Sequence, residues 1–281
     1  MSIGRMLLSS WSPSRQRLRE PGTVLSAIVL LTVVVAGLVA PLLGYEPGLD
    51  VDPSRISEGP SFSAFMGTDH LGRSVGWRLA HACRAFTLPG LLAAITALVL
   101  GVPAGAVAGW RTGLLASTVR VLLDIVSAVP RLVLVLLVCT IFGPGFVTLA
   151  LAAGLAYAPT LADSIRVRVR DLRLAGHVDA WTTHGLSTPR ILWLHLVALG
   201  CGRLVIRRLL ELFAFVLVLE TTLSYIGGFG VPEPTPSWGN MLAFDWGHDG
   251  HLIPLFAPAV ALWATLAATA RVASVFAECE T

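Results

Sequence analysis

The sequence predicts an all-α membrane protein with six transmembrane helices, and three observations lead to that class. First, 55% of the 281 residues are hydrophobic and only 13% are charged, whereas a soluble domain carries about 25% charged residues. Second, apolar runs recur along the chain, each close to the roughly 20 residues that a helix needs to cross a bilayer. Third, the arginines gather between those runs, most densely between residues 164 and 208. We therefore expect a multi-pass protein of the cell membrane, in contact with lipid.

The predicted transmembrane domain covers residues 23–275 and follows a cytosolic tail at 1–22. The six predicted spans lie at about 23–44, 86–109, 120–142, 146–163, 205–226 and 252–270, with a cytosolic loop at 164–204. The first run is longer than the 7–15 apolar residues of a signal peptide. We therefore predict an uncleaved first span.

The boundary between the third and fourth spans follows from one turn. Residues 132–162 carry no charge and are too many for a single span. A Gly-Pro-Gly sequence at 143–145 lies in their middle, and such residues break helices and form tight turns. The third span must then extend back to about 120.

Several charged residues fall within or near the predicted spans. An ionised group at mid-bilayer costs about 2.5–3.5 kcal/mol on insertion scales, so such groups usually face the protein interior. Asp124 and Arg131 are predicted on one face of the third span, with a kink at Pro130 between them. Glu220 is expected to line a pathway or to pair with an arginine of a partner, and Asp124 and Arg131 are candidates for the same pathway or partner contact. Glu211 is expected to form an ion pair within its own helix.

The arginine distribution predicts the orientation. Most arginines lie in the tail, in the turn after the second span and in the 164–208 region, and fewer lie in the 45–84 and 227–250 segments. By the positive-inside rule, both termini are predicted in the cytosol and those two segments outside. The net charge of +3 therefore informs topology and gives no indication of nucleic-acid binding.

Several function classes are excluded or disfavoured. The sequence has no GxxxxGK[ST] motif and no lysine, so the chain is not itself a P-loop ATPase. The four cysteines form no pair that suggests a disulfide framework or a zinc site. His248, Asp249 and His251 provide a poor ligand set. We expect no metal and no cofactor in this chain, and no cluster of side chains suggests a polytopic enzyme.

The cytosolic loop contains a pattern typical of a helix–turn–helix. The residues concerned are Asp179, Ala180, Trp181, Gly185, Arg190, Ile191 and His195. Glycine permits a sharp bend or a close approach, and Pro189 is suited to open the second helix. From these residues alone, an amphipathic loop packed on lipid headgroups remains the alternative.

Two further motifs lie in the segments predicted outside. The stretch from Glu220 to Leu242 contains Pro236, Trp238 and Asn240 in the order Pro-Ser-Trp-Gly-Asn-Met-Leu. The stretch at 66–73 contains Gly67, Asp69, Gly72 and Arg73. Together with the 179–195 loop, these segments resemble the permease subunits of bacterial dipeptide and oligopeptide ABC importers, specifically the shorter of two paired permeases. The stretch from Glu220 is similar to the family's acid-x-x-LSFLGLG-x-x-PPTPSWGNML sequence, the second to LGTD-x-x-GRD, and the loop to the EAA motif.

The resemblance implies a type I ABC importer transmembrane domain that forms half of a translocation pathway. It also implies a second permease as heterodimer partner, ABC ATPase subunits that bind ATP and Mg²⁺, and a substrate-binding protein. The loop residues would contact the ATPase. The chain departs from the family at Trp181, where alanine is usual, and at Ser74, where aspartate is usual. Import of nickel or glutathione is the alternative within this class, and a stand-alone secondary transporter is the alternative outside it.

Overall fold

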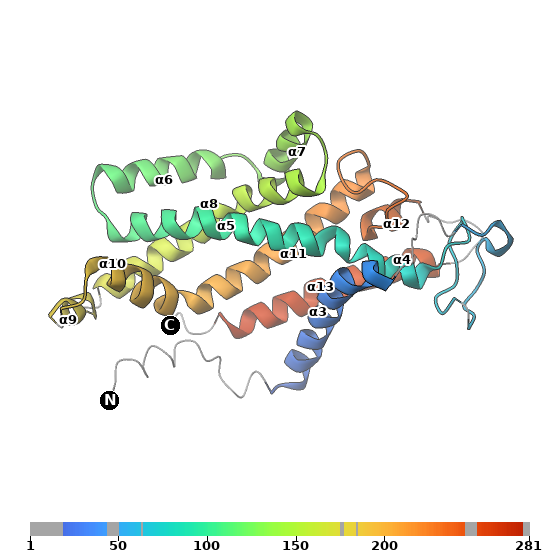
Figure 1. Ribbon diagram of the computed structural model, residues 1–281, viewed down its shortest axis with the longest axis horizontal. Coiled ribbons are helices and arrows are strands. Elements are labelled where there is room, and N and C mark those ends of the chain that lie inside the picture. The colour runs from blue at the N-terminus through green and yellow to red at the C-terminus, as the bar shows by residue number, and fades with distance from the viewer. Residues whose placement is uncertain are drawn as a thin grey trace.

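The computed structural model describes residues 19–43, 51–62, 64–174, 177–183, 185–244 and 252–277 (Figure 1). In chain order the helices are α3 (Pro21–Val39), η1 (Ala40–Leu43), η2 (Pro53–Arg55), α4 (Val75–Ala82), α5 (Arg84–Trp110), α6 (Leu114–Ser127), α7 (Arg131–Phe142), α8 (Phe146–Leu174), α9 (His177–Thr183), α10 (Thr188–Arg190), the π-helix η3 (Ile191–Gly200), α11 (Gly202–Ile226), α12 (Trp238–Phe244) and α13 (Ile253–Val275). Most of the predicted tail at 1–22, and His248, Asp249 and His251, lie outside the described residues.

The described chain is all-helical, with one isolated bridge between Thr68 and Ser74, which confirms the predicted fold class. Five stretches are long and apolar enough to cross a membrane: Pro21–Val39, Val75–Trp110, Phe146–Leu174, Gly202–Ile226 and Ile253–Val275. A pair formed by α6 and α7 would make a sixth. The most apolar part of α8 is 61% buried, against 11% for α3, so α8 is central and α3 peripheral.

The third predicted span differs from the expectation of one kinked helix. α6 and α7 are separate helices, bent by 81° at a break of a few residues. The break falls at Pro130, which precedes the first residue of α7 and disfavours helical geometry in the residue before it. Asp124 lies on α6 and Arg131 on α7, so the prediction that they share one helix face is wrong.

α5 and α8 run parallel to each other in close backbone contact. Gly101, Gly105 and Gly109 recur every four residues on α5. A Cβ on Gly105 would lie 2.4 Å from the carbonyl oxygen of Ala162, and one on Gly109 would lie 2.7 Å from that of Arg166. Small residues allow helices to approach closely in this way. A larger side chain at either glycine would push the two helices apart.

The molecule is elongated, and its two ends contain different elements (Figure 1). α9 and α10 lie at one end of the long axis, whereas α4, α12 and the loop at 51–74 lie at the other. α3 and α13 pack together alongside. Near the start of α3, Glu20 forms an ion pair with Arg271 of α13 at 3.1 Å.

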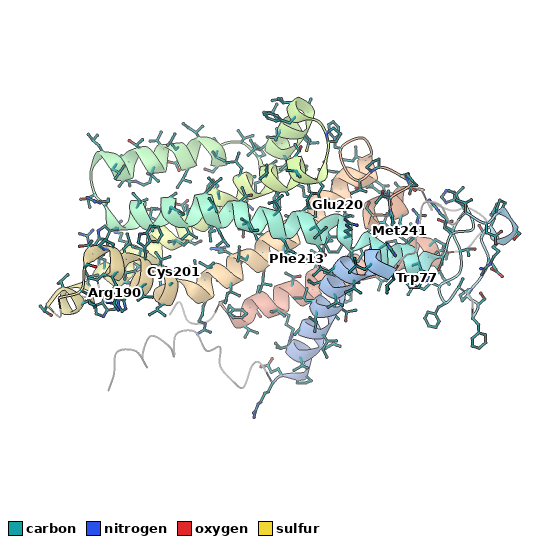
Figure 2. The ribbon with its side chains drawn as sticks, in the orientation of Figure 1. Trp77, Arg190, Cys201, Phe213, Glu220 and Met241 are labelled. Atoms are coloured by element: carbon teal, nitrogen blue, oxygen red, sulfur yellow. The ribbon has the colours of Figure 1, made fainter. Side chains whose placement is uncertain are left out.

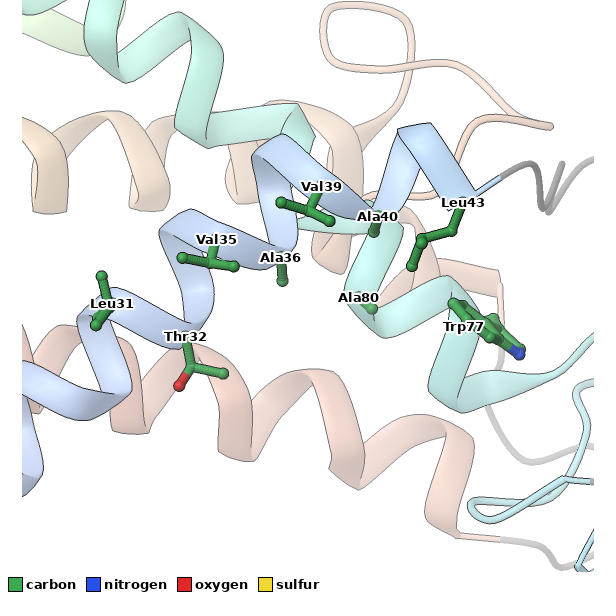
Figure 3. Close-up of a pocket in the computed structure, with 9 residues that line it drawn as sticks. All are labelled: Leu31, Thr32, Val35, Ala36, Val39, Ala40, Leu43, Trp77 and Ala80. Carbon is green, nitrogen blue, oxygen red and sulfur yellow. The ribbon is translucent and has the colours of Figure 1, made fainter.

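An apolar groove of about 460 Å³ runs between α3, η1 and α4 (Figure 3). Its lining consists of Leu31, Thr32, Val35, Ala36, Val39, Ala40, Leu43, Trp77 and Ala80. Among the described residues that line it, none is charged and Thr32 alone carries a hydroxyl group. The groove therefore offers nothing that would recognise a charged or strongly polar solute, and it belongs to the apolar surface of α3.

Candidate functional site

Most of the residues that the sequence singles out lie in two regions at opposite ends of the molecule. One is the α9–η3 segment, residues 177–200, which joins α8 to α11. The other is the Asp69 cluster, which we define as Asp69, Arg73, Arg78 and Glu233. Figure 2 shows Arg190 at the first end, and Glu220 and Met241 toward the second.

α9 is followed by a glycine turn. Gly185 has a φ of +76°, and its N–H donates to the Thr182 carbonyl at 2.9 Å. The N–H of Leu186 donates to the Trp181 carbonyl at 3.2 Å. These two bonds form a Schellman motif, which favours glycine in the left-handed conformation. No described atom lies within 4 Å of a Cβ built on Gly185, so the turn provides the predicted bend and projects into open space.

The second short helix begins as the sequence predicts. α10 starts at Thr188, with Pro189 in its first turn. Arg190 is exposed, whereas Ile191 is fully buried in the main apolar core. Ile191 therefore anchors the segment to the main apolar core, whereas the side chain of Arg190 is open to contact from outside the chain.

Trp181 and His195 hold the segment together. Their ring centroids lie 5.0 Å apart with planes 27° from parallel, and Trp181 is only 5% exposed. The Nδ1 atom of His195 is buried and has no hydrogen-bond partner among the described residues. Asp179 and Ala180 lie in α9, but their side chains are outside the described part of the chain. The burial of Trp181 favours packing within this chain over insertion into a partner.

The segment is attached to the long helices by several contacts. Gly200, the last residue of η3, packs against Leu172 of α8, whose Cδ1 would lie 2.5 Å from an added Cβ. Arg173 of α8 donates to the carbonyl of Trp110 at the end of α5, and its guanidinium lies 5.3 Å from the Trp110 ring centroid. A displacement of the α9–η3 segment would therefore shift α8 and, through the contacts of Arg173 with Trp110, also α5.

The Asp69 cluster is a buried network of two carboxylates and two arginines. Oδ2 of Asp69 accepts from Nε of Arg73 at 2.7 Å and also from Nη1 of Arg78. Glu233 accepts from Arg73 at 2.9 Å and from Arg78 at 2.7 Å. Both arginines and Asp69 are at most 2% exposed. The cluster therefore ties the loop at 51–74 to the loop after α11, about 160 residues later in the chain.

Charge interactions decide the ionisation of Asp69. Burial alone would raise the pKa of its carboxyl group, but Arg78, Arg73 and the backbone N–H groups of Arg73 and Leu71 together hold that pKa below its ordinary value of 3.8. Burial alone would lower the pKa of the Arg73 guanidinium, but Asp69 and Glu233 together raise it above its ordinary value. Asp69 and Arg73 are therefore both charged at neutral pH.

The two motif glycines beside Asp69 are required by crowding. Gly67 and Gly72 have φ values of +75° and +77°. A Cβ on Gly67 would lie 2.5 Å from the Glu58 carbonyl oxygen, and one on Gly72 would lie 1.9 Å from that of Asp52. Any side chain at Gly72 would force the loop apart.

The motif residues before and within α12 form local contacts at the end of the molecule that contains the Asp69 cluster. Asn240 accepts from the Ser237 N–H at 2.9 Å, and Ser237 Oγ accepts from the Asn240 N–H at 3.1 Å. This reciprocal pair is a capping box in which asparagine replaces the usual Glu or Gln. Trp238 donates from Nε1 to the Leu79 carbonyl at 3.2 Å. Pro236 is buried next to this cap.

Glu220 is 1% exposed and lies within this end of the chain. Its Oε1 accepts from Ser224 Oγ at 2.6 Å, one turn further along α11. Ser224 also accepts from the Val231 N–H at 2.9 Å. Glu220 is thus connected, through Ser224, to the loop that follows α11, and its predicted place on a pathway or at a partner stays a prediction.

The remaining charges within the long helices are distributed unevenly. Asp124 is exposed on α6. Arg131 is exposed at the start of α7 and donates to Thr160 at 2.7 Å. Glu211 forms ion pairs with Arg207 at 3.0 Å and Arg208 at 2.7 Å, which confirms the predicted intrahelical pairing.

Sequence reasoning missed residues of the Asp69 cluster and a contact of Arg131. It did not select Arg78 or Glu233 as site residues, although Glu233 lies within the stretch from Glu220 to Leu242. No pattern in the sequence shows which arginine pairs with Glu233. It also missed Tyr157, whose ring lies 5.1 Å from the Arg131 guanidinium. An aromatic residue in an apolar helix gives no signal of such a contact.

The chain is similar to known membrane transport proteins. Residues 101–277 match the family described as the binding-protein-dependent transport system inner membrane component. The probable peptide ABC transporter permease protein of Sinorhizobium fredii is 32% identical over 225 residues, which cover 80% of this chain and 76% of that protein. The oligopeptide transport system permease protein of Bacillus subtilis is 28% identical over 240 residues, 85% of this chain and 78% of the relative. The dipeptide transport system permease protein of Alkalihalophilus pseudofirmus is 24% identical over 237 residues, with 84% and 77% covered.

Proposed function

The chain belongs to the binding-protein-dependent transport system inner membrane component family, and from that premise we propose that it is a permease subunit of an ATP-driven importer of dipeptides or oligopeptides. It would form half of the translocation pathway in the cell membrane. The observation that carries this proposal is the alignment of peptide transport permeases over 80–85% of the chain. The all-helical architecture with long apolar helices supports it.

The proposed substrate class, peptides, follows from those relatives. A substrate-binding protein would select the individual substrate. Import of nickel or glutathione by the same kind of complex is therefore the alternative. A stand-alone secondary transporter would be built from inverted repeats, and none is evident in the sequence. Family membership favours the ATP-driven complex.

The proposal includes partners and an orientation. A second permease subunit completes the pathway, ABC ATPase subunits bind ATP and Mg²⁺, and a substrate-binding protein delivers the peptide. Both termini and the α9–η3 segment lie in the cytosol, because arginines concentrate on that side. The Asp69 cluster then lies outside, on the side from which the peptide arrives.

The α9–η3 segment is the proposed docking site for the ATPase. Its glycine turn projects away from the chain at Gly185, and Arg190 is exposed beside it. Ile191 and Trp181 are buried and would keep the segment rigid. A rigid segment attached to α8 at Leu172 would transfer a push from the ATPase to the helices on either side, α8 and α11.

The first experiment tests the function itself. The complex encoded with this chain is purified and reconstituted into proteoliposomes. ATP is supplied on the side of the membrane that the ATPase subunits face. Labelled alanine di-, tri- and tetrapeptides, Ni²⁺ and glutathione are supplied on the opposite side. We expect ATP-dependent uptake of at least one peptide. Uptake of Ni²⁺ or glutathione alone would replace the peptide assignment, and uptake driven by an ion gradient without ATPase subunits would overturn the proposal.

The second experiment tests the docking site. Gly185→Ala and Gly185→Leu carry similar left-handed backbone strain, but only leucine adds bulk to the docking surface. We expect substrate-stimulated ATP turnover to fall about tenfold or more in Gly185→Leu relative to Gly185→Ala, the effect of losing about 1.4 kcal/mol of contact energy. Gly113→Leu, compared with Gly113→Ala, is the control for added bulk, because Gly113 also has positive φ and open surroundings but lies in the α5–α6 turn. Equal turnover in Gly185→Leu and Gly113→Leu would exclude docking at this turn.

A further inference from the structure

Arg131 is held in a defined orientation by residues from two other helices. Its guanidinium lies 5.1 Å from the ring centroid of Tyr157 on α8 and 5.7 Å from that of Phe215 on α11. Nη2 donates to Thr160 Oγ1 at 2.7 Å. The two rings are themselves stacked, with centroids 6.3 Å apart. We call Arg131, Tyr157, Thr160 and Phe215 the Arg131 site.

The support beneath the guanidinium is also fixed. The Tyr157 hydroxyl donates to Glu211 Oε2 at 3.1 Å, and Tyr157 is only 3% exposed. Glu211 is in turn held by Arg207 and Arg208. The ring that carries Arg131 therefore has little freedom to turn. An arginine fixed against aromatic faces loses less conformational entropy when it binds a ligand than a free surface arginine does.

The site lies part-way along α5 and α8. Tyr157 and Thr160 bracket Ala158, whose carbonyl oxygen lies 2.9 Å from the Cβ position of Gly101 on α5. Gly101 is ten residues, or about 15 Å, from Arg111 and seventeen residues, or about 26 Å, from Arg84, the charges that bound α5. A charge at that depth is unfavourable in lipid, so it normally faces a water-filled cavity or a counter-ion.

The described chain provides no counter-ion for Arg131. The nearby carboxylate of Glu211 is shared between Arg207 and Arg208, and Asp163 pairs with Arg166 at 3.0 Å. No ion pair to Arg131 occurs among the described residues, and Thr160 is its one hydrogen-bond partner there. The side chain is nevertheless exposed. A positively charged, pre-oriented guanidinium is thus open on one side, part-way along the helices that would flank the pathway.

We propose that the Arg131 site binds the C-terminal carboxylate of the peptide during its passage. This inference rests on the proposed function, because it takes the peptide and its pathway from there. Guanidinium groups bind carboxylates through two parallel N–H···O bonds, and every unmodified peptide carries one such group whatever its side chains. The site therefore suits a transporter whose substrates share their terminus and differ elsewhere.

The position of the site also explains release. Tyr157 and Thr160 lie on α8 and Phe215 lies on α11, the two helices that flank the α9–η3 segment. A movement that separates α8 from α11 would remove one ring from the guanidinium and change its position. The affinity of the Arg131 site for a carboxylate would decrease as the ATPase-driven displacement moves these helices. Binding and release would then follow the same motion that opens the pathway.

A cycle of four uptake measurements tests the proposal. The alanine peptide that is imported best and its C-terminal amide are compared in proteoliposomes of the wild-type complex and of Arg131→Gln. We expect Arg131→Gln to lower uptake of the free acid by about tenfold or more, the effect of losing a charge-assisted hydrogen bond, and to leave uptake of the amide within about twofold. The binding protein's own preference for the acid or the amide does not affect the result, because each peptide is compared between two complexes that use the same binding protein.

Two more variants complete the design. Arg131→Lys retains the charge but not the planar fork, so acid uptake should fall by an intermediate factor. Arg120→Gln removes an exposed arginine of α6 that makes only local bonds and should leave both uptakes unchanged.

Each other outcome is informative. An equal loss for acid and amide in Arg131→Gln would show that Arg131 is structural and overturn the inference. Loss of the second permease from the purified Arg131→Gln complex would also overturn it, since Arg131 would then pair with a carboxylate of that partner. If the wild-type complex imports no peptide, the proposed function itself fails, and this inference fails with it.

Discussion

Gly72 and Gly185 adopt almost the same left-handed backbone, with φ values of +77° and +76°, in opposite surroundings. A Cβ on Gly72 would lie 1.9 Å from the carbonyl oxygen of Asp52, whereas no described atom comes within 4 Å of one on Gly185. Both glycines belong to motifs that the sequence singles out. The first is required by contacts inside the chain, and the second leaves room for a contact from outside.

The charged residues of the two regions show the same difference. Asp69 and Arg78 are buried and paired with each other and with neighbours. Arg190 of the α9–η3 segment is exposed. A motif can therefore mark a rigid part of the fold or a surface for a partner, and the surroundings of its residues distinguish the two. Substitutions in the Asp69 cluster should act on stability, and those at the exposed residues of the α9–η3 segment should act on coupling.

The largest effect is expected from Asp69→Asn. It leaves two buried arginines with Glu233 as their remaining carboxylate, and breaking a buried pair costs about 3–5 kcal/mol. The melting temperature of the purified complex should fall by several degrees. Glu58→Gln is the control, because Glu58 forms a partly exposed ion pair with Arg55: the Arg55 side chain is 32% exposed and the Glu58 side chain 45%. Such surface pairs contribute about 0–1 kcal/mol to stability. Similar melting temperatures for the two variants would show that the cluster does not hold the loops together.

The same cluster predicts a dependence on pH. The pKa of Asp69 is lower in the folded chain than its ordinary value, so its ionisation stabilises the fold above the unfolded pKa of about 3.9. That contribution is lost as the pH falls through the folded pKa. The difference in melting temperature between wild type and Asp69→Asn should therefore be constant from neutral pH to about pH 5 and shrink below about pH 4. A constant difference down to pH 3 would contradict the ionised state of Asp69.

The next effect compares the two glycines directly. Gly72→Ala combines left-handed strain, about 1–2 kcal/mol, with a clash against backbone that cannot move aside. Gly185→Ala has the strain alone. The loss of melting temperature should be at least twice as large for Gly72→Ala. Equal losses would mean that the loop at 51–74 rearranges freely and is not rigid.

The sequence predicts the long helices well because local signals define them. The fifth span is expected at about 205–226, and α11 covers Gly202–Ile226. The second is expected at about 86–109, and α5 covers Arg84–Trp110. Apolar length and flanking charges are enough for these boundaries. Whether each helix crosses the membrane stays a prediction.

Features that depend on distant residues could not be predicted in the same way. Pro130 indicates a change of direction, but it does not predict the 81° angle or that α7 packs against α8. The pairing of Arg78 with Glu233 joins residues 155 positions apart. The contact of Arg131 with Tyr157 and Phe215 brings three helices together. A single sequence contains the residues of these contacts but no sign of which ones meet.

A smaller effect is expected at the start of α12. Ser237→Ala removes one half of the capping box with Asn240, and the loss of such a cap costs about 1 kcal/mol. The melting temperature should fall slightly, and Ser237→Thr, which keeps the hydroxyl in this fully buried position, should recover part of the loss. No recovery would indicate that buried packing, and not capping, determines stability at this position.

The smallest effect on stability, and the clearest test of the comparison, is expected at Arg190. Its side chain is exposed, so Arg190→Ala should change stability by less than about 0.5 kcal/mol. If the α9–η3 segment receives the ATPase, the same substitution should lower substrate-stimulated ATP turnover while the purified complex melts normally. Arg120→Ala provides an exposed arginine of similar surroundings outside the segment. A variant that melts and turns over ATP like wild type would show that Arg190 makes no contact of consequence, and the docking surface would then reduce to the turn at Gly185.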